Sequence, residues 1–170
     1  EGKQTPANLH SLIRTSEACF KSTAFAIELA KKHNAKLHIA HISTKEELEL
    51  LSAGKIENKN ITAEVSPNHL WFSEKDFEKY GNLIKCNPSI KTIEDRNALR
   101  KALNEDKIDI IATDHAPHKL EEKQKSYFQA PSGIPSIQHS LLMMLELVNQ
   151  DVLTIEKLVE KMSHNPATLF

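Results

Sequence analysis

A histidine and an aspartate in this chain occupy positions from which they could bind a divalent metal ion. Asp114 directly follows the apolar run 108–113, and His41 lies near the end of a second apolar run, 36–42. Imidazole and carboxylate are both good ligands for zinc and similar ions. A buried carboxylate also needs a compensating partner, because an unpaired charge in the interior is costly. A metal ion would supply that partner, and an aspartate that caps the next turn is the ordinary alternative.

The chain has nine histidines, and few of them have a context that suggests chemistry. His38 precedes His41 by two residues, so we expect a different orientation and treat it as the weaker candidate. His118 follows Asp114 by four residues in the same segment, where it could bind a substrate or a developing negative charge.

These side chains require a scaffold, and the hydrophobic pattern predicts strands that alternate with helices. Such alternation indicates parallel βαβ units, whose chemistry lies where the strands end. We predict that residues 1–15 form a loop, that Ser16 caps the first helix and that Thr44 caps the second. The predicted strands are 36–42, 60–65, 82–86 and 108–113. The predicted helices are 16–34, 43–54, 92–105, 136–149, 154–162 and one that begins at Asn165.

The composition argues against a nucleic-acid-binding, a membrane-spanning or a disulfide-rich protein. The 170 residues include 22 basic and 23 acidic side chains, so the net charge of −1 provides no electrostatic footprint for nucleic acid. No apolar run approaches the length of a membrane span. Two cysteines, Cys19 and Cys86, do not make a disulfide framework, and a reducing cytoplasmic compartment fits best. The first residue is Glu1 rather than Met, so we expect that the natural protein begins upstream.

Five segments resemble, in order, the motifs of the dihydroorotase family in the amidohydrolase superfamily. They are 38–44 (His-Ile-Ala-His-Ile-Ser-Thr), 64–70 (Glu-Val-Ser-Pro-Asn-His-Leu), 86–91 (Cys-Asn-Pro-Ser-Ile-Lys), 114–118 (Asp-His-Ala-Pro-His) and 132–135 (Ser-Gly-Ile-Pro). The resemblance covers nearly the whole chain. It implies a (β/α)8 barrel of the TIM type, with a metal centre of two zinc ions at the carboxyl ends of its strands.

The resemblance also implies roles for individual residues. His41 looks like the metal ligand of the sixth strand, and Asp114 like the ligand and general base of the eighth. Glu64 lies at the end of the seventh strand, next to the metal ligands, and His69 is assigned only to packing. The substrate-contact positions are Asn87, His118, Ser132 and Gly133.

The main departure from the family pattern is that several of the expected metal ligands are missing from this chain. The first-strand His-x-His pair, the bridging lysine of the fourth strand and the fifth-strand histidine have no counterpart here. A barrel of this type has about 250 residues, so we expect residues 1–170 to form one partial barrel domain, strands six to eight. The fragment alone should be inactive. Two smaller departures are Asn68, where the family has histidine, and 89–91, where it has Pro-Leu-Arg.

The implied function is the reversible ring opening of dihydroorotate to N-carbamoyl-L-aspartate in pyrimidine biosynthesis. Its partner is a small-molecule substrate, and a homodimer or an aspartate transcarbamoylase partner is compatible with it. Other cyclic amidohydrolases (dihydropyrimidinase, hydantoinase, allantoinase) are alternatives, as is a non-catalytic dihydroorotase-like subunit. A stand-alone α/β binding module is a further alternative.

Overall fold

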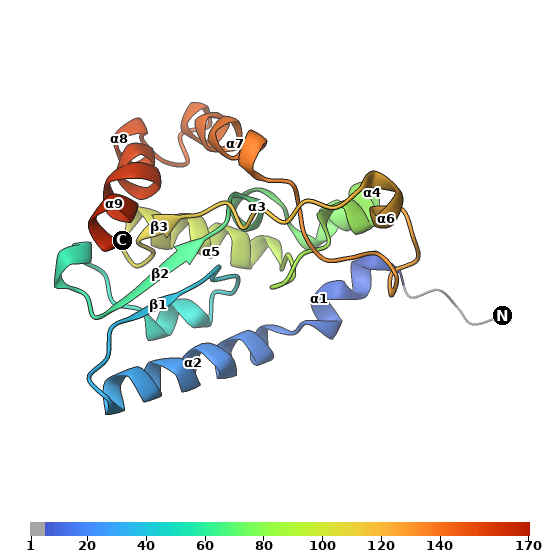
Figure 1. The fold of residues 1–170 in the computed structure, drawn as a ribbon. Coiled ribbons are helices and arrows are strands. Elements are labelled where there is room, and N and C mark those ends of the chain that lie inside the picture. The colour runs from blue at the N-terminus through green and yellow to red at the C-terminus, as the bar shows by residue number, and fades with distance from the viewer. Residues whose placement is uncertain (1–5) are drawn as a thin grey trace.

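The structure, a computed structural model, describes residues 6–170 and contains a parallel sheet of three strands in the order β1-β2-β3 (Figure 1). The strands are β1 (Leu37–Ile39), β2 (Ile61–Val65) and β3 (Ile110–Ile111). Each lies inside a predicted strand range. Leu37 pairs with Ile61, and Glu64 pairs with Ile110. The parallel pairing brings the carboxyl ends of all three strands to one edge of the sheet.

Helices connect and surround these strands. They are α1 (His10–Ile13), α2 (Ser16–Lys32), α3 (Pro67–Trp71), α4 (Phe77–Tyr80), α5 (Ile93–Asn104), α6 (Leu120–Lys123), α7 (Ile137–Asn149), α8 (Ile155–Val159) and α9 (Asn165–Leu169). Short 3₁₀ turns span Ala7–Leu9, Glu47–Leu50, Ile56–Asn58, Glu74–Asp76 and Gly81–Ile84, and a π turn, Glu160–His164, joins α8 to α9. Helix α2 lies beside β1, and α7 to α9 lie beyond β3 (Figure 1). None of the helices formed by residues 6–170 is long and apolar enough to cross a membrane.

The long helices were predicted correctly because each combines an apolar stripe with a recognisable start. Thr92 caps α5: its hydroxyl accepts from the Asp95 amide at 3.1 Å, and the Asp95 carboxylate accepts from the Thr92 amide at 3.1 Å. Helix α2 is capped one residue earlier than predicted. Thr15, not Ser16, is its N-cap, since the Thr15 hydroxyl accepts from the Ala18 amide.

Three local predictions were wrong. The predicted helix 43–54 is replaced by a single turn, because the Glu47 carboxylate turns inward and accepts hydrogen bonds from the amides of Ser43 and Thr44. In place of the predicted strand 82–86, a 3₁₀ turn begins at Gly81, whose φ is 51°, and ends at Ile84. A short apolar run does not by itself distinguish a strand from a buried turn. Residues 7–13 of the predicted loop are helical, and residues 1–5 lie outside the described part of the chain.

The two faces of the sheet differ in chemistry. One face carries Ala63, Val65 and Ile111, which pack in the main core with apolar side chains of α5 and α7. Because successive side chains in a strand alternate between faces, His38 and Glu64 lie on the opposite face. That face is therefore polar at the positions nearest the candidate site.

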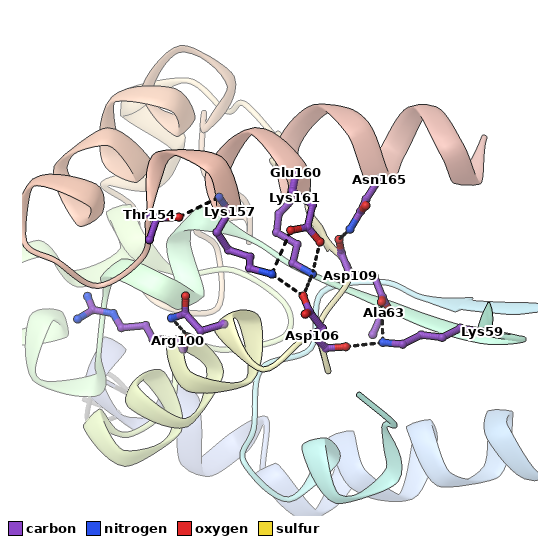
Figure 2. A network of polar contacts seen from close by, with 11 residues as sticks. Lys59, Ala63, Arg100, Asp106, Asp109, Thr154, Lys157, Glu160, Lys161 and Asn165 are labelled. Atoms are coloured by element: carbon purple, nitrogen blue, oxygen red, sulfur yellow. Dashed lines mark hydrogen bonds and ion pairs between the residues drawn. The ribbon is translucent and has the colours of Figure 1, made fainter. Parts of the chain in front are cut away.

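A polar network joins the amino ends of β2 and β3 (Figure 2). Lys59 pairs with Asp109 at 2.7 Å, and the second Asp109 oxygen accepts from the Ala63 amide at 2.9 Å. Lys157 and Lys161 both contact Asp106 at 2.7 Å. This network fixes the π turn and α8 against the segment that enters β3.

Candidate metal and substrate site

His41 and Asp114 leave their strands in the same unusual backbone conformation. His41 follows β1 with φ 40°, and Asp114 follows β3 with φ 47°. Few residues other than glycine adopt positive φ, although Asn, Asp and His do so more often. Such strain costs on the order of 1–3 kcal/mol and concentrates at functional sites. Both residues therefore sit at sharp turns on the edge where the carboxyl ends of the strands meet.

The charge environment of Asp114 ties it to two other candidates. Burial raises the pKa of the Asp114 carboxyl group, the charge of His41 lowers it, and the Glu64 carboxylate raises it. Among residues 6–170, the Asp114 carboxylate has no hydrogen-bond or ion-pair partner. The structure thus brings His41, Glu64 and Asp114 within electrostatic reach of one another.

Glu64 is held on the polar face of the sheet by His38. The Nε2 atom of His38 lies 3.1 Å from Glu64 Oε2, and its Nδ1 lies 2.8 Å from the Thr62 hydroxyl. Both ring nitrogens of His38 are thereby engaged, so this residue orients Glu64 rather than presenting a free donor atom. The weaker status predicted for His38 as a ligand agrees with these contacts.

His41 lies at the wall of a cavity of about 410 Å³ between α2 and the end of β1. Asn87, which precedes Pro88 through a cis peptide bond, lines the same cavity. The structure therefore brings these two predicted site residues together. Asp114, His118, Ser132 and Gly133 do not line this cavity.

The predicted substrate loop packs on the segment that follows Asp114. His118 Nε2 donates to the Ser132 carbonyl at 3.1 Å, and the Ala116 amide donates to the Ile134 carbonyl at 3.1 Å. Gly133 has φ 146°, and a Cβ atom there would lie 2.6 Å from the Ala116 carbonyl oxygen. Only glycine allows this close approach.

His69 has the packing role predicted for it. Its Nε2 donates to the Pro88 carbonyl at 3.0 Å, and its Nδ1 accepts from the Ser66 hydroxyl at 2.8 Å. Burial lowers the pKa of His69 to about 3, so the ring is neutral. Asn68 donates to the Ser136 hydroxyl at 2.8 Å, which ties α3 to the start of α7.

The donor atoms on this edge suit a metal ion but do not complete a site. His41 Nδ1 is a buried atom without a hydrogen-bond partner among residues 6–170, which is the state expected of a nitrogen that can bind a metal ion. The nearby Asp114 carboxylate is a second donor. No group of three or more His, Cys, Asp or Glu side chains within the described residues forms a metal site. His41 and Asp114 therefore fit part of a metal centre.

Sequence reasoning missed Lys85 and Lys123, two buried lysines beneath the predicted substrate positions. Lysine side chains are mostly exposed in folded proteins, so the residue type gave no indication that these two are buried.

Curated relatives of this chain are dihydroorotases. The chain is 38% identical over 173 residues to the dihydroorotase of Methanosphaera stadtmanae, and the match covers 99% of this chain and 39% of the relative. It is 42% identical over 144 residues to the dihydroorotase of Carboxydothermus hydrogenoformans, a match that covers 84% of this chain and 34% of the relative. The chain thus spans between about a third and two fifths of the length of these relatives. No family model matches it.

Solved structures give the same picture of the fold. An L-hydantoinase (dihydropyrimidinase) from Arthrobacter aurescens superposes with a TM-score of 0.82 at 30% identity, covering 88% of this chain and 34% of that one. A dihydroorotase from Saccharomyces cerevisiae superposes with a TM-score of 0.78 at 18% identity, covering 92% of this chain and 43% of that one, which bears on the fold alone. The prediction of an α/β fold that forms part of a TIM-type barrel is confirmed.

Proposed function

Because this chain belongs to the dihydroorotase family of the amidohydrolase superfamily, we propose that the protein containing it is a dihydroorotase. The reaction interconverts dihydroorotate and N-carbamoyl-L-aspartate by hydrolysis and closure of a cyclic amide. One observation carries the proposal: His41 lies within electrostatic reach of Asp114 at the carboxyl edge of the sheet, and no residue among 6–170 engages His41 Nδ1 or the Asp114 carboxylate.

Each candidate residue then has a chemical role. Asp114 takes a proton from the attacking water and delivers it to the leaving ring nitrogen. The Asn87 side chain donates to the substrate carboxylate. The Nε2 atom of His118 is engaged by the Ser132 carbonyl, so its Nδ1 is the atom that meets the substrate. The backbone of Ser132 and Gly133 supplies further contacts, and Glu64 orients the metal ligands.

We propose that His41 and Asp114 each bind zinc, with two ions in a complete site. An ion held by these residues would supply an acidified water molecule and would polarise the amide carbonyl. The remaining ligands come from barrel segments outside this chain. The unpartnered Nδ1 of His41 and the carboxylate of Asp114 are suitable donors for this ion.

We further propose that residues 1–170 form one partial domain, the sixth to eighth strands of the barrel. Two edges of the described structure support this. Strand β1 pairs only with β2 among the described residues, so its other side is open to a further strand. Helix α7 exposes Ile137, Leu141 and Leu145, which are 64%, 52% and 39% exposed and lie at helical spacing. Neighbouring barrel elements would cover both edges.

The proposed setting is pyrimidine biosynthesis in the cytoplasm. Cys19 and Cys86 are both free thiols, which suits a reducing compartment. The partner is the small-molecule substrate.

A second candidate is a hydantoinase or dihydropyrimidinase, favoured by the 30% identity to the Arthrobacter enzyme. A substrate panel on the intact protein discriminates the two, with dihydroorotate, N-carbamoyl-L-aspartate, dihydrouracil and hydantoins at equal concentration. We expect turnover of the first pair to dominate. Turnover of hydantoins without turnover of dihydroorotate would refute the proposal.

The metal assignment has its own test. His41→Ala in the intact protein should lower the zinc content measured by elemental analysis, because it removes one donor nitrogen. His33→Ala, on an exposed histidine beyond α2, is the matched control and should leave the content unchanged. Unchanged zinc in His41→Ala would remove this residue from the ligand set, and absence of zinc in the unsubstituted protein would favour a non-catalytic subunit.

A further inference from the structure

Two buried lysines lie beneath the predicted substrate loop. Lys123 is 5% exposed and Lys85 is 7% exposed. Among residues 6–170, neither ammonium group pairs with a carboxylate. Both are instead surrounded by backbone carbonyl oxygens, which makes them unlike the paired lysines at the other end of the sheet.

Lys123 is the hub of this arrangement. Its Nζ donates to the carbonyl oxygens of Lys85 at 3.0 Å, Pro131 at 3.0 Å and Gly133 at 2.8 Å. An ammonium group has three donors, so all three are used. One side chain from α6 thus joins the segment that leads to Asn87 with the loop that contains Ser132.

Burial of this ammonium group has an energetic cost that the three carbonyls only partly offset. Burial, with a smaller contribution from the charge of Lys85, lowers the pKa of Lys123 to about 8. Transfer of a charge from water to the interior is unfavourable unless its hydrogen bonds are satisfied. A buried lysine at this position therefore stabilises the protein less than an exposed one would, but its three hydrogen bonds hold the 131–133 loop in place.

The loop that Lys123 fixes touches both groups of predicted substrate residues. On one side, the Gly133 amide donates to the Lys85 carbonyl at 2.8 Å. On the other side, His118 Nε2 donates to the Ser132 carbonyl, and the Ile134 carbonyl accepts from the Ala116 amide. The loop thus hydrogen-bonds to both segments, to Lys85 next to Asn87 on one side and to residues 116–118 on the other.

Lys85 secures the preceding part of the same loop. Its Nζ donates to the carbonyls of Tyr127 and Ala130, each at 2.6 Å, and lies 4.3 Å from the centre of the Tyr127 ring. The Tyr127 hydroxyl in turn contacts His10 Nδ1 at 2.7 Å. The segment 126–131 is consequently held before the chain reaches Ser132.

We propose that Lys123 is a positioning residue for substrate recognition, whose ammonium group holds the 131–133 loop so that His118 and the Gly133 backbone keep a fixed relation to Asn87. This role rests on the proposed dihydroorotase function. Lys123 does not touch the reacting atoms. Its loss displaces binding groups rather than removing one.

The test is Lys123→Met in the intact protein, which keeps the length of the side chain and removes the three donors. Because misplaced binding groups weaken substrate binding, KM for dihydroorotate should rise about tenfold while kcat changes less than about threefold. Zinc content should not change. Lys125→Met, on an exposed lysine two residues away, is the matched control and should leave both constants unchanged.

A second measurement reports on the order of the 131–133 loop itself. Deuterium exchange of the peptide containing residues 131–134 should become faster in Lys123→Met, since the Gly133 amide loses its ordered acceptor. If the methionine variant does not fold, Lys123→Gln, which removes the charge and shortens the side chain, replaces it in both measurements. Unchanged KM, or a raised KM without faster exchange, would overturn the positioning role.

The two proposals fail in different ways. If the unsubstituted protein turns over hydantoins and not dihydroorotate, the proposed function is wrong. The comparison of KM between Lys123→Met and Lys125→Met, made with a hydantoin, then still decides whether Lys123 positions the substrate-binding groups.

Discussion

The two ends of strand β3 carry aspartates in opposite circumstances. At the amino end, Asp109 pairs with Lys59 and the Ala63 amide, and Asp106 accepts from two lysines. At the carboxyl end, Asp114 has no hydrogen-bond or ion-pair partner among residues 6–170, and burial raises its pKa. The aspartates at the amino end are thus held by lysines, whereas no side chain among residues 6–170 holds the partly exposed Asp114 carboxylate.

This difference between the paired and the unpaired aspartates matches the way in which barrels of parallel strands use the two ends of their strands. Residues at the amino ends serve stability, whereas residues at the carboxyl ends serve catalysis. Charged groups that are fully paired stabilise a structure, but they are not free to bind a metal ion or move a proton. The four predictions that follow test this contrast, beginning with the largest expected effect.

Asp114→Asn should abolish turnover while preserving the fold. Loss of a general base lowers the rate by about 10²–10⁴-fold, and loss of a metal ligand adds to this. The free energy of unfolding should stay the same or rise in the metal-free protein, because burial disfavours the charged form. Steady-state kinetics and urea denaturation of the intact protein measure the two quantities. Retained turnover would contradict the assignment of Asp114 as the base.

Asp109→Asn should have the converse effect. It leaves the buried Lys59 ammonium group without its carboxylate, and loss of one partner of a buried ion pair costs about 3–5 kcal/mol. Turnover per folded molecule should not change, since Asp109 lies at the far end of the strand. Lys101→Met, which breaks an exposed pair with Glu105, is the control. A lowered kcat in folded Asp109→Asn would show that the amino end of β3 also affects catalysis and would contradict this contrast.

His69 should make stability sensitive to acid. Its folded pKa of about 3 lies below the ordinary value of 6.5, so the unfolded chain binds more protons between these values. Stability from this group is complete above pH 6.5 and is lost as pH falls toward 3. The loss from pH 6.5 to 5 is about 2 kcal/mol. Urea denaturation at both pH values should show a smaller loss for His69→Gln, and equal losses would contradict the buried neutral ring.

Lys157→Met should have the smallest effect. Lys157 is 21% exposed, and Asp106 keeps its second partner, Lys161. Partly exposed ion pairs contribute about 0.2–1 kcal/mol. Lys161→Met should destabilise the protein more, because the Lys161 side chain is only 1% exposed. Thermal unfolding of the two variants side by side measures the difference, and the reverse ranking would show that burial does not govern this network.

Some of the fold was predictable from the sequence because local signals agree there with the tertiary structure. Helix α5 combines the capping pair Thr92–Asp95 with an apolar stripe, and β2 alternates apolar and polar residues and ends shortly before Pro67. The ordered motifs around His41 and Asp114 likewise predicted the family. These signals act within a few residues, so they do not depend on what packs against them.

Other features depended on contacts between distant residues. The turn at 47–50 forms because the Glu47 carboxylate accepts from the Thr23 hydroxyl, 24 residues away, as well as from nearby amides. Helix α1 places His10 against the Cys86 carbonyl and the Tyr127 hydroxyl. Neither partner is adjacent in sequence, so hydrophobic periodicity carried no signal for either element.

The sequence by itself determined which residues could do chemistry and at the ends of which strands they lie, since residue type and strand pattern are local properties. Only the tertiary structure decided how these residues are held. It left the His41 Nδ1 and Asp114 carboxylate without partners, paired Glu64 with His38 and buried Lys123 among three carbonyls. Hydrogen bonding and burial are set by groups that fold together from distant parts of the chain. That is why a lysine that looks like a surface residue in the sequence is buried against the predicted substrate loop.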